Sequence, residues 1–274
     1  MNLSDSDQLR AFLSRSGIRA DKGLGQNFLC SPPVVDAILA RLSHCSGILE
    51  IGPGPGVLTQ RFEGRTVVAL ELDPRMVQML RTSAPFADVR QSDALRTDFF
   101  LLLDGMPAPR AIVGNIPYYI TSPLLERVAG VGSLIDRAVL MMQREVGERI
   151  AAPAGNSARG SPSVFLQSRF EIQKVIDVPP DAFIPPPKVH STVMELLPRV
   201  VSGATEEVFR IVRAGFTQPR KTLANNLSAV AARPVVVAAI ERLGLSATVR
   251  PHELTLEAWI EVAARLGRDT PTPT

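Results

Sequence analysis

The chain has 274 residues, of which 45% are hydrophobic and 21% are charged; this composition predicts one large folded domain or two and excludes disorder as the main state. Its 30 basic and 27 acidic side chains leave a formal net charge of +3, which by itself points to no polyanionic partner. Two cysteines are too few for a disulfide scaffold or a four-ligand zinc site. The N-terminus lacks a basic patch followed by an apolar stretch, and the longest uncharged run, 111–125, contains Asn and Pro. We therefore expect no signal peptide, no membrane span and a cytoplasmic protein.

The first 46 residues are predicted to form two helices separated by an irregular loop. Asp5 or Ser6 can cap the first helix, and Gly17 can end it. The glycine-broken sequence KGLGQNFL at 22–29 fits neither the helical nor the strand period. Ser31 and the two prolines that follow it are typical of the start of a second helix.

Strands and helices then alternate along the chain. Hydrophobic runs of strand length recur at 48–51, 66–70, 88–91, 111–114 and 138–142. Helical patterns between most of them predict a mainly parallel sheet covered on both faces. Two later runs, at 170–178 and 190–197, are joined by a proline-rich segment instead of a helix, which suits an antiparallel end to the sheet.

The last part of the chain has a helical pattern from about residue 205 onward. We therefore predict an α/β domain over 1–200 and a small all-α domain over 201–268. The final residues, DTPTPT at 269–274, carry no apolar anchor, so we expect a disordered tail there.

Three glycines follow the first strand of the predicted sheet. In ILEIGPGPGVLT, Gly52, Gly54 and Gly56 stand between a hydrophobic strand and a helix, where the backbone can approach a nucleotide-like ligand closely. Glu71 comes 19 positions after Gly52 at the end of the next strand and can accept hydrogen bonds from ribose hydroxyls. The G-x-G-x-G spacing and the lack of a Walker lysine disfavour NAD and ATP. The motif predicts a different ribose-containing cofactor, with a tight strand-to-helix turn as the alternative.

Asp93 in SDAL follows the third strand and should face the same crevice. A carboxylate at this place can accept a hydrogen bond from the amino group of a cofactor adenine. The alternative is an ordinary helix cap, since Asp is a preferred capping residue.

An Asn-x-Pro-aromatic element follows the fourth strand, in GNIPYYITSPLL at 114–125. The exocyclic amine of adenine is a poor nucleophile because its lone pair is delocalised into the ring. The Asn115 side-chain carbonyl and the backbone carbonyl near Pro117 could hold its two hydrogens and turn the lone pair toward a methyl donor. Tyr118 could stack on a base extruded from its helix. The alternative is a proline turn with packed tyrosines. The three histidines suggest neither a metal site nor a catalytic triad.

Together these motifs resemble the ribosomal RNA adenine dimethyltransferases, specifically the small-subunit type. The resemblance extends over almost the whole chain and includes LGQNFL at 24–29, EIGPGPGVLT at 50–59, ELD at 71–73, SDAL at 92–95, NIPYY at 115–119, QREVGERI at 143–150, FIPPPKVHS at 183–191 and FTQPRKTLANNL at 216–227. It implies a Rossmann-like class I methyltransferase sheet with a C-terminal helical RNA-binding domain. It also implies dimethylation of the 6-amino groups of two adjacent adenosines near the 3′ end of small-subunit ribosomal RNA.

The resemblance further implies S-adenosyl-L-methionine as the methyl donor, partly covered by the loop within residues 1–46. The donor would be contacted by Asn27, Leu29, Gly52, Glu71, Asp93 and Asn115. Tyr118 and Phe183 would sandwich the target base.

A local basic stretch favours an RNA partner. Five basic residues and no acidic one fall within 208–240; among them Arg220 and Lys221 are candidate phosphate contacts, as are Arg144 and Arg149 after the fifth strand. The alternative for such runs is a solvated helical face. We expect a monomer that acts on small-subunit ribosomal RNA or on the pre-assembled small subunit.

Two other functions fit part of the pattern. A large-subunit methyltransferase of the macrolide-resistance type would share GxGxG and N-x-P-Y, but LGQNFL and FIPPPKV favour the small-subunit type. A non-catalytic ribosome assembly factor could keep the fold, but intact Asn115, Pro117 and Tyr118 favour an active enzyme.

Overall fold

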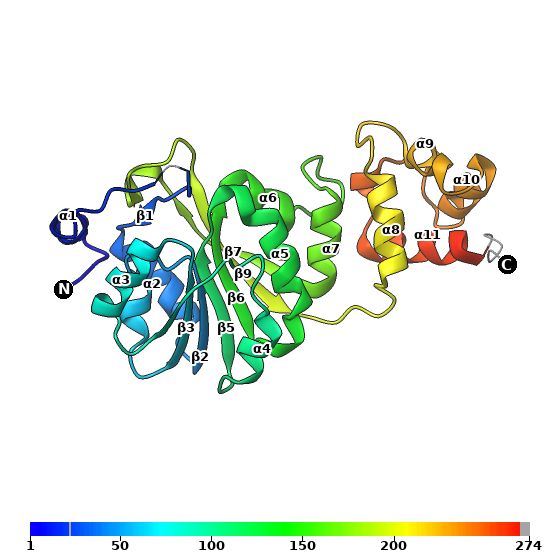
Figure 1. The fold of residues 1–274 in the computed structure, drawn as a ribbon. Helices are drawn as coiled ribbons and strands as arrows, with labels where there is room; N and C mark the ends of the chain where they lie inside the picture. Colours follow the sequence, from blue (N-terminus) through cyan, green and yellow to red (C-terminus); the bar gives the residue numbers. More distant parts are fainter. Residues whose placement is uncertain (22, 269–274) are drawn as a thin grey trace. The chain divides into compact units, whose positions relative to one another are not determined.

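The computed structural model describes residues 1–21 and 23–268. The tail predicted for 269–274 lies outside the described residues. The chain forms two compact units, coloured by sequence in Figure 1. The first comprises Met1–Gly147 and Phe170–Pro198, and the second comprises Glu148–Arg169 and the chain from Arg199 onward.

A seven-stranded mixed sheet organises the first unit. Its strand order is β4-β3-β2-β5-β6-β9-β7. The strands are β2 (Gly47–Ile51), β3 (Thr66–Glu71), β4 (Asp88–Gln91), β5 (Arg110–Asn115), β6 (Arg137–Gln143), β7 (Phe170–Val178) and β9 (Ser191–Pro198). The first five strands in this order pair in parallel, whereas β9 runs antiparallel to both of its neighbours. This confirms the predicted mainly parallel sheet with an antiparallel end.

Helices cover both faces of this sheet. In Figure 1, α2 and α3 lie on one face, and α4 and α5 lie on the other. The α-helices of this part of the chain are α1 (Ser6–Arg15), α2 (Pro32–Arg41), α3 (Pro74–Ser83), α4 (Phe99–Asp104), α5 (Thr121–Gly130) and α6 (Arg144–Ala151), and the 3-10 turns are η1 (Thr59–Phe62), η2 (Tyr118–Ile120), η3 (Gly132–Leu134) and η4 (Pro180–Ala182). Asp5 caps α1 as expected, since its side chain accepts hydrogen bonds from the backbone of Asp7 and Gln8.

A short second sheet pairs β1 (Phe28–Leu29) with β8 (Phe183–Ile184) in antiparallel fashion. The pairing attaches the irregular LGQNFL loop to the proline-rich connection between β7 and β9. The sequence pattern did not reveal it, because two residues are too few to show a strand period.

One buried carboxylate lies within the large sheet. Glu195 of β9 is 1% exposed, and its two oxygens accept from Arg137 at 2.6 Å and from Arg41 at 3.3 Å. This pairing compensates a charge that would otherwise be costly to bury.

The second unit is helical. It contains α7 (Ser161–Arg169), α8 (Glu206–Gly215), α9 (Leu223–Asn226), η5 (Leu227–Ala229), α10 (Arg233–Glu241), η6 (Pro251–Glu253) and α11 (Leu256–Arg268). Trp259 of α11 is fully buried and stacks on Phe216, with ring centroids 5.6 Å apart. No helix within residues 1–21 and 23–268 is long and apolar enough to cross a membrane.

The segment Glu148–Arg169 differs from its predicted assignment to the α/β domain. The structure groups it with the C-terminal helices, because α7 buries Val164 in their core. The Phe165 ring also meets Phe209 of α8 edge to face, with centroids 5.1 Å apart.

Candidate active site

A cavity of about 290 Å³ lies at the carboxyl ends of the parallel strands, with a volume near the lower end of those typical of small-molecule sites. Its lining comes from five segments, residues 24–29, 50–58, 70–72, 92–95 and 115–120, although Gly56 is not part of it. The predicted residues that line it are Asn27, Leu29, Gly52, Gly54, Glu71, Asp93, Asn115, Pro117 and Tyr118. The structure therefore brings together residues that the sequence places up to 91 positions apart, from Asn27 to Tyr118.

The glycine turn after β2 has the backbone that a close ligand approach requires. Gly52 and Gly54 have φ values of +65° and +57°, which side-chain-bearing residues rarely adopt. A Cβ added to Gly54 would also lie 3.1 Å from the Phe28 ring. Both glycines thus keep the backbone bare at the cavity.

Gly56 is a correction to the predicted cofactor set. It does not line the cavity; a Cβ at this position would lie 2.5 Å from the hydroxyl oxygen of Ser83 and 3.1 Å from Leu80, both on α3. The third glycine therefore serves helix packing, a role that glycine spacing alone does not distinguish from ligand binding.

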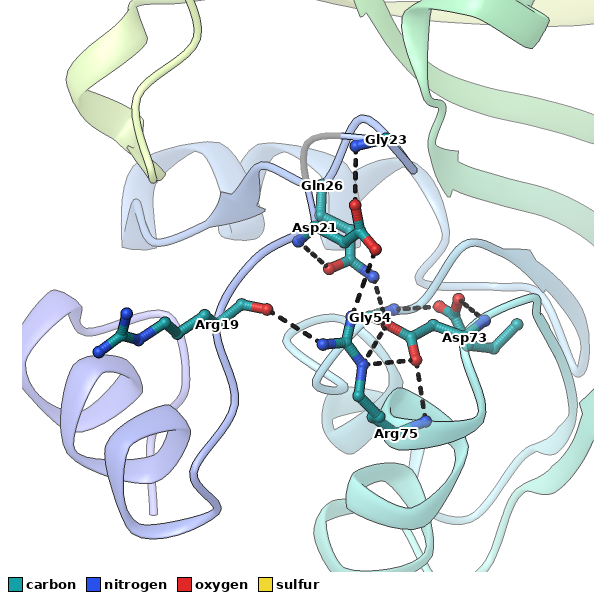
Figure 2. Close-up of polar contacts among 8 residues, drawn as sticks. Arg19, Asp21, Gly23, Gln26, Gly54, Asp73 and Arg75 are labelled. Atoms are coloured by element: carbon teal, nitrogen blue, oxygen red, sulfur yellow. Dashed lines mark hydrogen bonds and ion pairs between the residues drawn. The ribbon is translucent and has the colours of Figure 1, made fainter.

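Glu71 ends β3 with its carboxylate inside the cavity wall. Its Oε2 accepts from the Gly54 backbone N–H and its Oε1 from that of Asp73, both at 2.9 Å; Figure 2 shows Gly54 and Asp73 in this network. Burial raises the pKa of Glu71. Each oxygen keeps a further lone pair, so the side chain can still accept from ligand hydroxyls.

A second buried carboxylate lines the cavity and was not predicted from the sequence. Glu50 of β2 is 2% exposed. Among the described residues, none donates a hydrogen bond to its Oε2. Burial raises its pKa to about 8; the Thr59 hydroxyl acts against this rise and the negative charge of Glu71 acts with it. The available signal was a carboxylate inside the otherwise apolar run ILEI.

Asp93 combines both of its predicted arrangements. It lines the cavity, and its Oδ1 also accepts from the backbone N–H of Leu95 at 2.8 Å, as in a helix cap. Its side chain is 38% exposed, with Arg96 at 3.6 Å.

Asn115 lies at the end of β5, where its amide is oriented from the facing loop. Its Nδ2 donates to the backbone carbonyl of Asn27 at 2.8 Å. Because the amide nitrogen is used in this bond, the acceptor Oδ1 on the other side of the amide is available to a ligand. The interaction spans 88 positions in the sequence, so the motif alone could not show it.

The Tyr118 ring is also held at its far end. Its hydroxyl lies 2.8 Å from that of Ser191, a fully buried residue of β9, and burial raises the pKa of the phenol. Tyr119 instead is 60% exposed, lines the same cavity, and has its ring against Gly25. The two tyrosines therefore have different surroundings.

Phe183 lies apart from the other predicted site residues. Its side chain is 2% exposed and belongs to the hydrophobic core, and it does not line the cavity. Its backbone pairs with Leu29 in the short second sheet. In this structure Phe183 packs beneath the loop that contains Leu29.

The predicted RNA contacts do not form one cluster within either unit. Arg144 starts α6 in the first unit, whereas Arg149 belongs to the second; both side chains are exposed. Arg220 and Lys221 are exposed on the turn between α8 and α9. Their side chains have no ion-pair partner among the residues that the structure describes.

The surrounding basic stretch is smaller than its composition suggested. Arg210 pairs with Glu207 and Arg213 with Glu206, each at 2.6 Å. Both acidic partners lie just before the stretch in sequence, so a count restricted to 208–240 omitted them.

The cavity fits S-adenosylmethionine in its chemistry. Three acidic side chains, Glu50, Glu71 and Asp93, line it, and their oxygens can accept from the ammonium group, the ribose hydroxyls and the adenine amine. The unpartnered Oε2 of Glu50 offers an acceptor to a cation. The seven-stranded sheet, with β9 antiparallel between β6 and β7 and a nucleoside site at its carboxyl edge, defines a class I methyltransferase.

Comparisons with known proteins give the particular family. The model of the family "Ribosomal RNA adenine dimethylase" matches residues 17–267. The chain is 38% identical over 265 residues to ribosomal RNA small subunit methyltransferase A of Synechococcus sp. (strain JA-3-3Ab), covering 91% of this chain and 94% of the relative. It is 39% identical to the protein of that name from Anaeromyxobacter dehalogenans (strain 2CP-C), covering 94% and 97%.

Solved structures agree with this result. A dimethyladenosine transferase from Plasmodium falciparum superposes with a TM-score of 0.76 at 25% identity, covering 88% of this chain and 98% of that one. The 23S rRNA methyltransferase ErmE gives 0.67 at 27% identity, covering 88% and 100%. The chain belongs to the ribosomal RNA adenine dimethylase family, and S-adenosylmethionine is its methyl donor.

Proposed function

We propose that the protein transfers methyl groups to the 6-amino groups of two adjacent adenosines near the 3′ end of small-subunit ribosomal RNA. The observation that carries this proposal is Asn115, whose amide is oriented by Asn27 at the edge of the cofactor cavity, beside Tyr118. The two relatives named for the small-subunit reaction, each covered over more than nine-tenths of its length, support the substrate class.

Different residues of the cavity bind the cofactor and the substrate. When bound, S-adenosylmethionine supplies an electrophilic methyl group. Glu71 holds the ribose hydroxyls and Asp93 the adenine amino group of the cofactor, next to the bare backbone of Gly52 and Gly54. Glu50 lies deeper in the wall and offers its carboxyl to the ammonium group.

The target adenine is activated by position. The Asn115 Oδ1 and the backbone carbonyl before Pro117 accept hydrogen bonds from the two N–H groups of the 6-amino group. These bonds favour a pyramidal nitrogen whose lone pair points at the methyl donor. Tyr118 stacks on the extruded base, and its bond to Ser191 fixes the plane of the ring. The arrangement needs no covalent intermediate and no strong general base.

RNA is held outside the cavity by basic side chains. Arg144, Arg149, Arg220 and Lys221 contact phosphates, and the helical part at 201–268 contributes most to positioning. The protein works in the cytoplasm on small-subunit ribosomal RNA or the pre-assembled small subunit. A monomer suffices, since one chain provides the whole cavity lining.

Methyl mapping tests the proposal. Labelled S-adenosylmethionine is offered with unmodified small subunits, with free small-subunit RNA, or with large-subunit RNA, and the modified adenosines are located. We expect dimethylation of two adjacent adenosines in the small-subunit substrate only. Label on large-subunit RNA alone would instead support an activity like that of the similar ErmE, and label on no substrate would support a non-catalytic assembly role.

The variant Asn115→Ala tests the mechanism itself. We expect at least a 100-fold loss of kcat, the size typical of removing one transition-state hydrogen bond, with the circular-dichroism spectrum unchanged. Turnover equal to that of the unaltered protein would refute the positioning of the amine.

A further inference from the structure

The loop that covers the cofactor cavity is attached at both ends. We define this covering segment as residues 19–21 and 23–29. Its later end is held by the bond from Asn115 to Asn27 and by the pairing of β1 with β8. Next to Asn27, the Gln26 Nε2 donates to the Asp73 Oδ2 at 2.8 Å, a contact drawn in Figure 2. Gln26 and Asp73 are 47 positions apart, so this bond connects two distant parts of the chain.

Both ends of the Gln26 amide are engaged. Its Oε1 accepts from the backbone N–H of Asp21 at 2.8 Å, and its own backbone N–H donates to the Asp21 carbonyl at 3.1 Å. Since the carbonyl end is occupied in this way, the amide presents its donor to Asp73. Gln26 thus closes the loop on itself and connects it to Asp73, the N-cap of α3.

Asp73 is the acceptor at the centre of this arrangement. It is 2% exposed and also receives the Arg75 guanidinium, with Nη2 at 2.6 Å from Oδ2 and Nε at 3.0 Å from Oδ1. Burial by itself would raise the pKa of Asp73, but the hydrogen bonds from Arg75 and Gln26 hold that pKa below its ordinary value. The Gln26 bond is therefore charge-assisted, which makes it stronger than a neutral one.

Arg75 contacts the covering segment directly as well. Its Nη1 donates to the Arg19 carbonyl at 3.5 Å, and its Nη2 lies 4.0 Å from a carboxylate oxygen of Asp21. These contacts are visible in Figure 2. The backbone N–H of Asp73 in turn donates to Glu71, so a single residue joins the covering segment to the carboxylate that lines the cavity.

We propose that Gln26, Asp73 and Arg75 form a clasp that holds the covering segment over the cofactor, with Gln26 and Arg75 as positioning residues for cofactor binding. The inference rests on the proposed function in one respect, the identity of the ligand as S-adenosylmethionine. Closure by the clasp retains the bound cofactor and keeps Glu71 in place through Asp73. Its loss weakens cofactor binding. Gln26 also lines the cavity, whereas Arg75 does not, so the Arg75 variant separates the clasp from a direct contact between Gln26 and the cofactor.

The chain contains a matched control for Arg75. Arg90 follows Asp88 by two positions on β4, as Arg75 follows Asp73, and its Nη2 lies 2.7 Å from the Asp88 carboxylate. Both partners of this pair are about half exposed, at 48% and 52%. The control pair therefore has the same spacing in the sequence and a similar guanidinium–carboxylate contact, without a buried acceptor or a bond to the covering segment.

Titration calorimetry with S-adenosylhomocysteine tests the clasp in the full-length protein. We expect Gln26→Ala to raise the Kd about tenfold, or about 1.4 kcal/mol, and Arg75→Gln to raise it in the same direction. Arg90→Gln should leave the Kd within about twofold. In steady-state assays, Gln26→Ala should raise the KM for S-adenosylmethionine with kcat nearly unchanged, because the clasp does not touch the reacting atoms.

Hydrogen exchange provides a readout that does not depend on turnover. S-adenosylhomocysteine should slow amide exchange in the covering segment of the unaltered protein, and this protection should be largely lost in Gln26→Ala. Asp73→Asn keeps a residue that can cap the helix, but its NH2 group can face the donors of Gln26 and Arg75, which would break their hydrogen bonds. Adding Gln26→Ala to Asp73→Asn should weaken binding no further, since both changes break one interaction.

The outcomes separate this inference from the proposed function. If the unaltered protein fails to bind S-adenosylhomocysteine, the proposed function fails and the clasp with it. If the unaltered protein binds but Gln26→Ala shows the same Kd and the same protection, the clasp alone is refuted. Additive losses in the double variant would also refute it, because independent structural effects add.

Discussion

The buried carboxyl of Glu50 makes a specific prediction about stability and pH. Its folded pKa is about 8, against an ordinary value of 4.5. Between these two pH values the folded chain holds one more proton than the unfolded chain, so stability falls as pH rises. The difference between the folded and unfolded pKa values of Glu50 corresponds to about 5 kcal/mol of unfolding free energy. This figure is the upper limit on the loss of stability between pH 5 and pH 8.

The substitution Glu50→Gln removes this titration while keeping the size of the side chain. We expect the unaltered protein to lose several kcal/mol of unfolding free energy between pH 5 and pH 8. The variant should lack this loss, because its side chain does not titrate. At pH 8 the variant should therefore be the more stable protein. Urea denaturation at pH 5, 6, 7 and 8 gives the difference directly. Glu63→Gln, at an exposed position, is the control and should follow the unaltered protein. Parallel decline of the unaltered protein and Glu50→Gln would refute the reasoning.

Three further predictions concern packing, a buried charge and RNA. Gly56→Ala combines a φ of +94° with a Cβ 2.5 Å from Ser83 and should lower the unfolding free energy by about 2–3 kcal/mol, measured by urea denaturation. Glu195→Ala removes the buried acceptor of Arg137, whose side chain is 20% exposed, and should cost about 2 kcal/mol by the same assay. Arg220→Gln and Lys221→Gln should each lower the slope of log binding constant against log salt concentration by about the share of one phosphate contact, measured by filter binding to RNA across ionic strength.

Each of these predictions has a contradicting result. Unchanged stability of Gly56→Ala would mean that the turn after β2 tolerates a side chain, and full stability of Glu195→Ala would mean that its arginine partners reach water. An unaltered salt slope in both basic variants would place the RNA contacts elsewhere.

Much of the fold could be predicted because it depends on local patterns. The alternation of hydrophobic runs with helical stretches predicted the strands of the large sheet, and the run at 190–197 correctly indicated its antiparallel end. The turn residues Gly52 and Gly54 followed from backbone freedom that glycine alone provides. These features depend on residues that are close together in the chain, so the sequence alone can show them.

The errors have a common physical origin in distant contacts. The burial of Phe183 depends on the pairing of its strand with Leu29, which places its side chain in the core. The third glycine, Gly56, is explained by Ser83, which lies 27 positions later. Two arginines of the basic stretch are neutralised by glutamates that precede it.

The sequence by itself determined the sheet, the family motifs and the order in which their residues reach the carboxyl edge. Only the tertiary structure decided which partner each side chain meets, as with Asn115 on Asn27, Gln26 on Asp73, and Glu50 in a wall with no partner for its Oε2 among the described residues. Local conformation follows from neighbouring residues, whereas hydrogen-bond partners and burial depend on segments that meet only after folding.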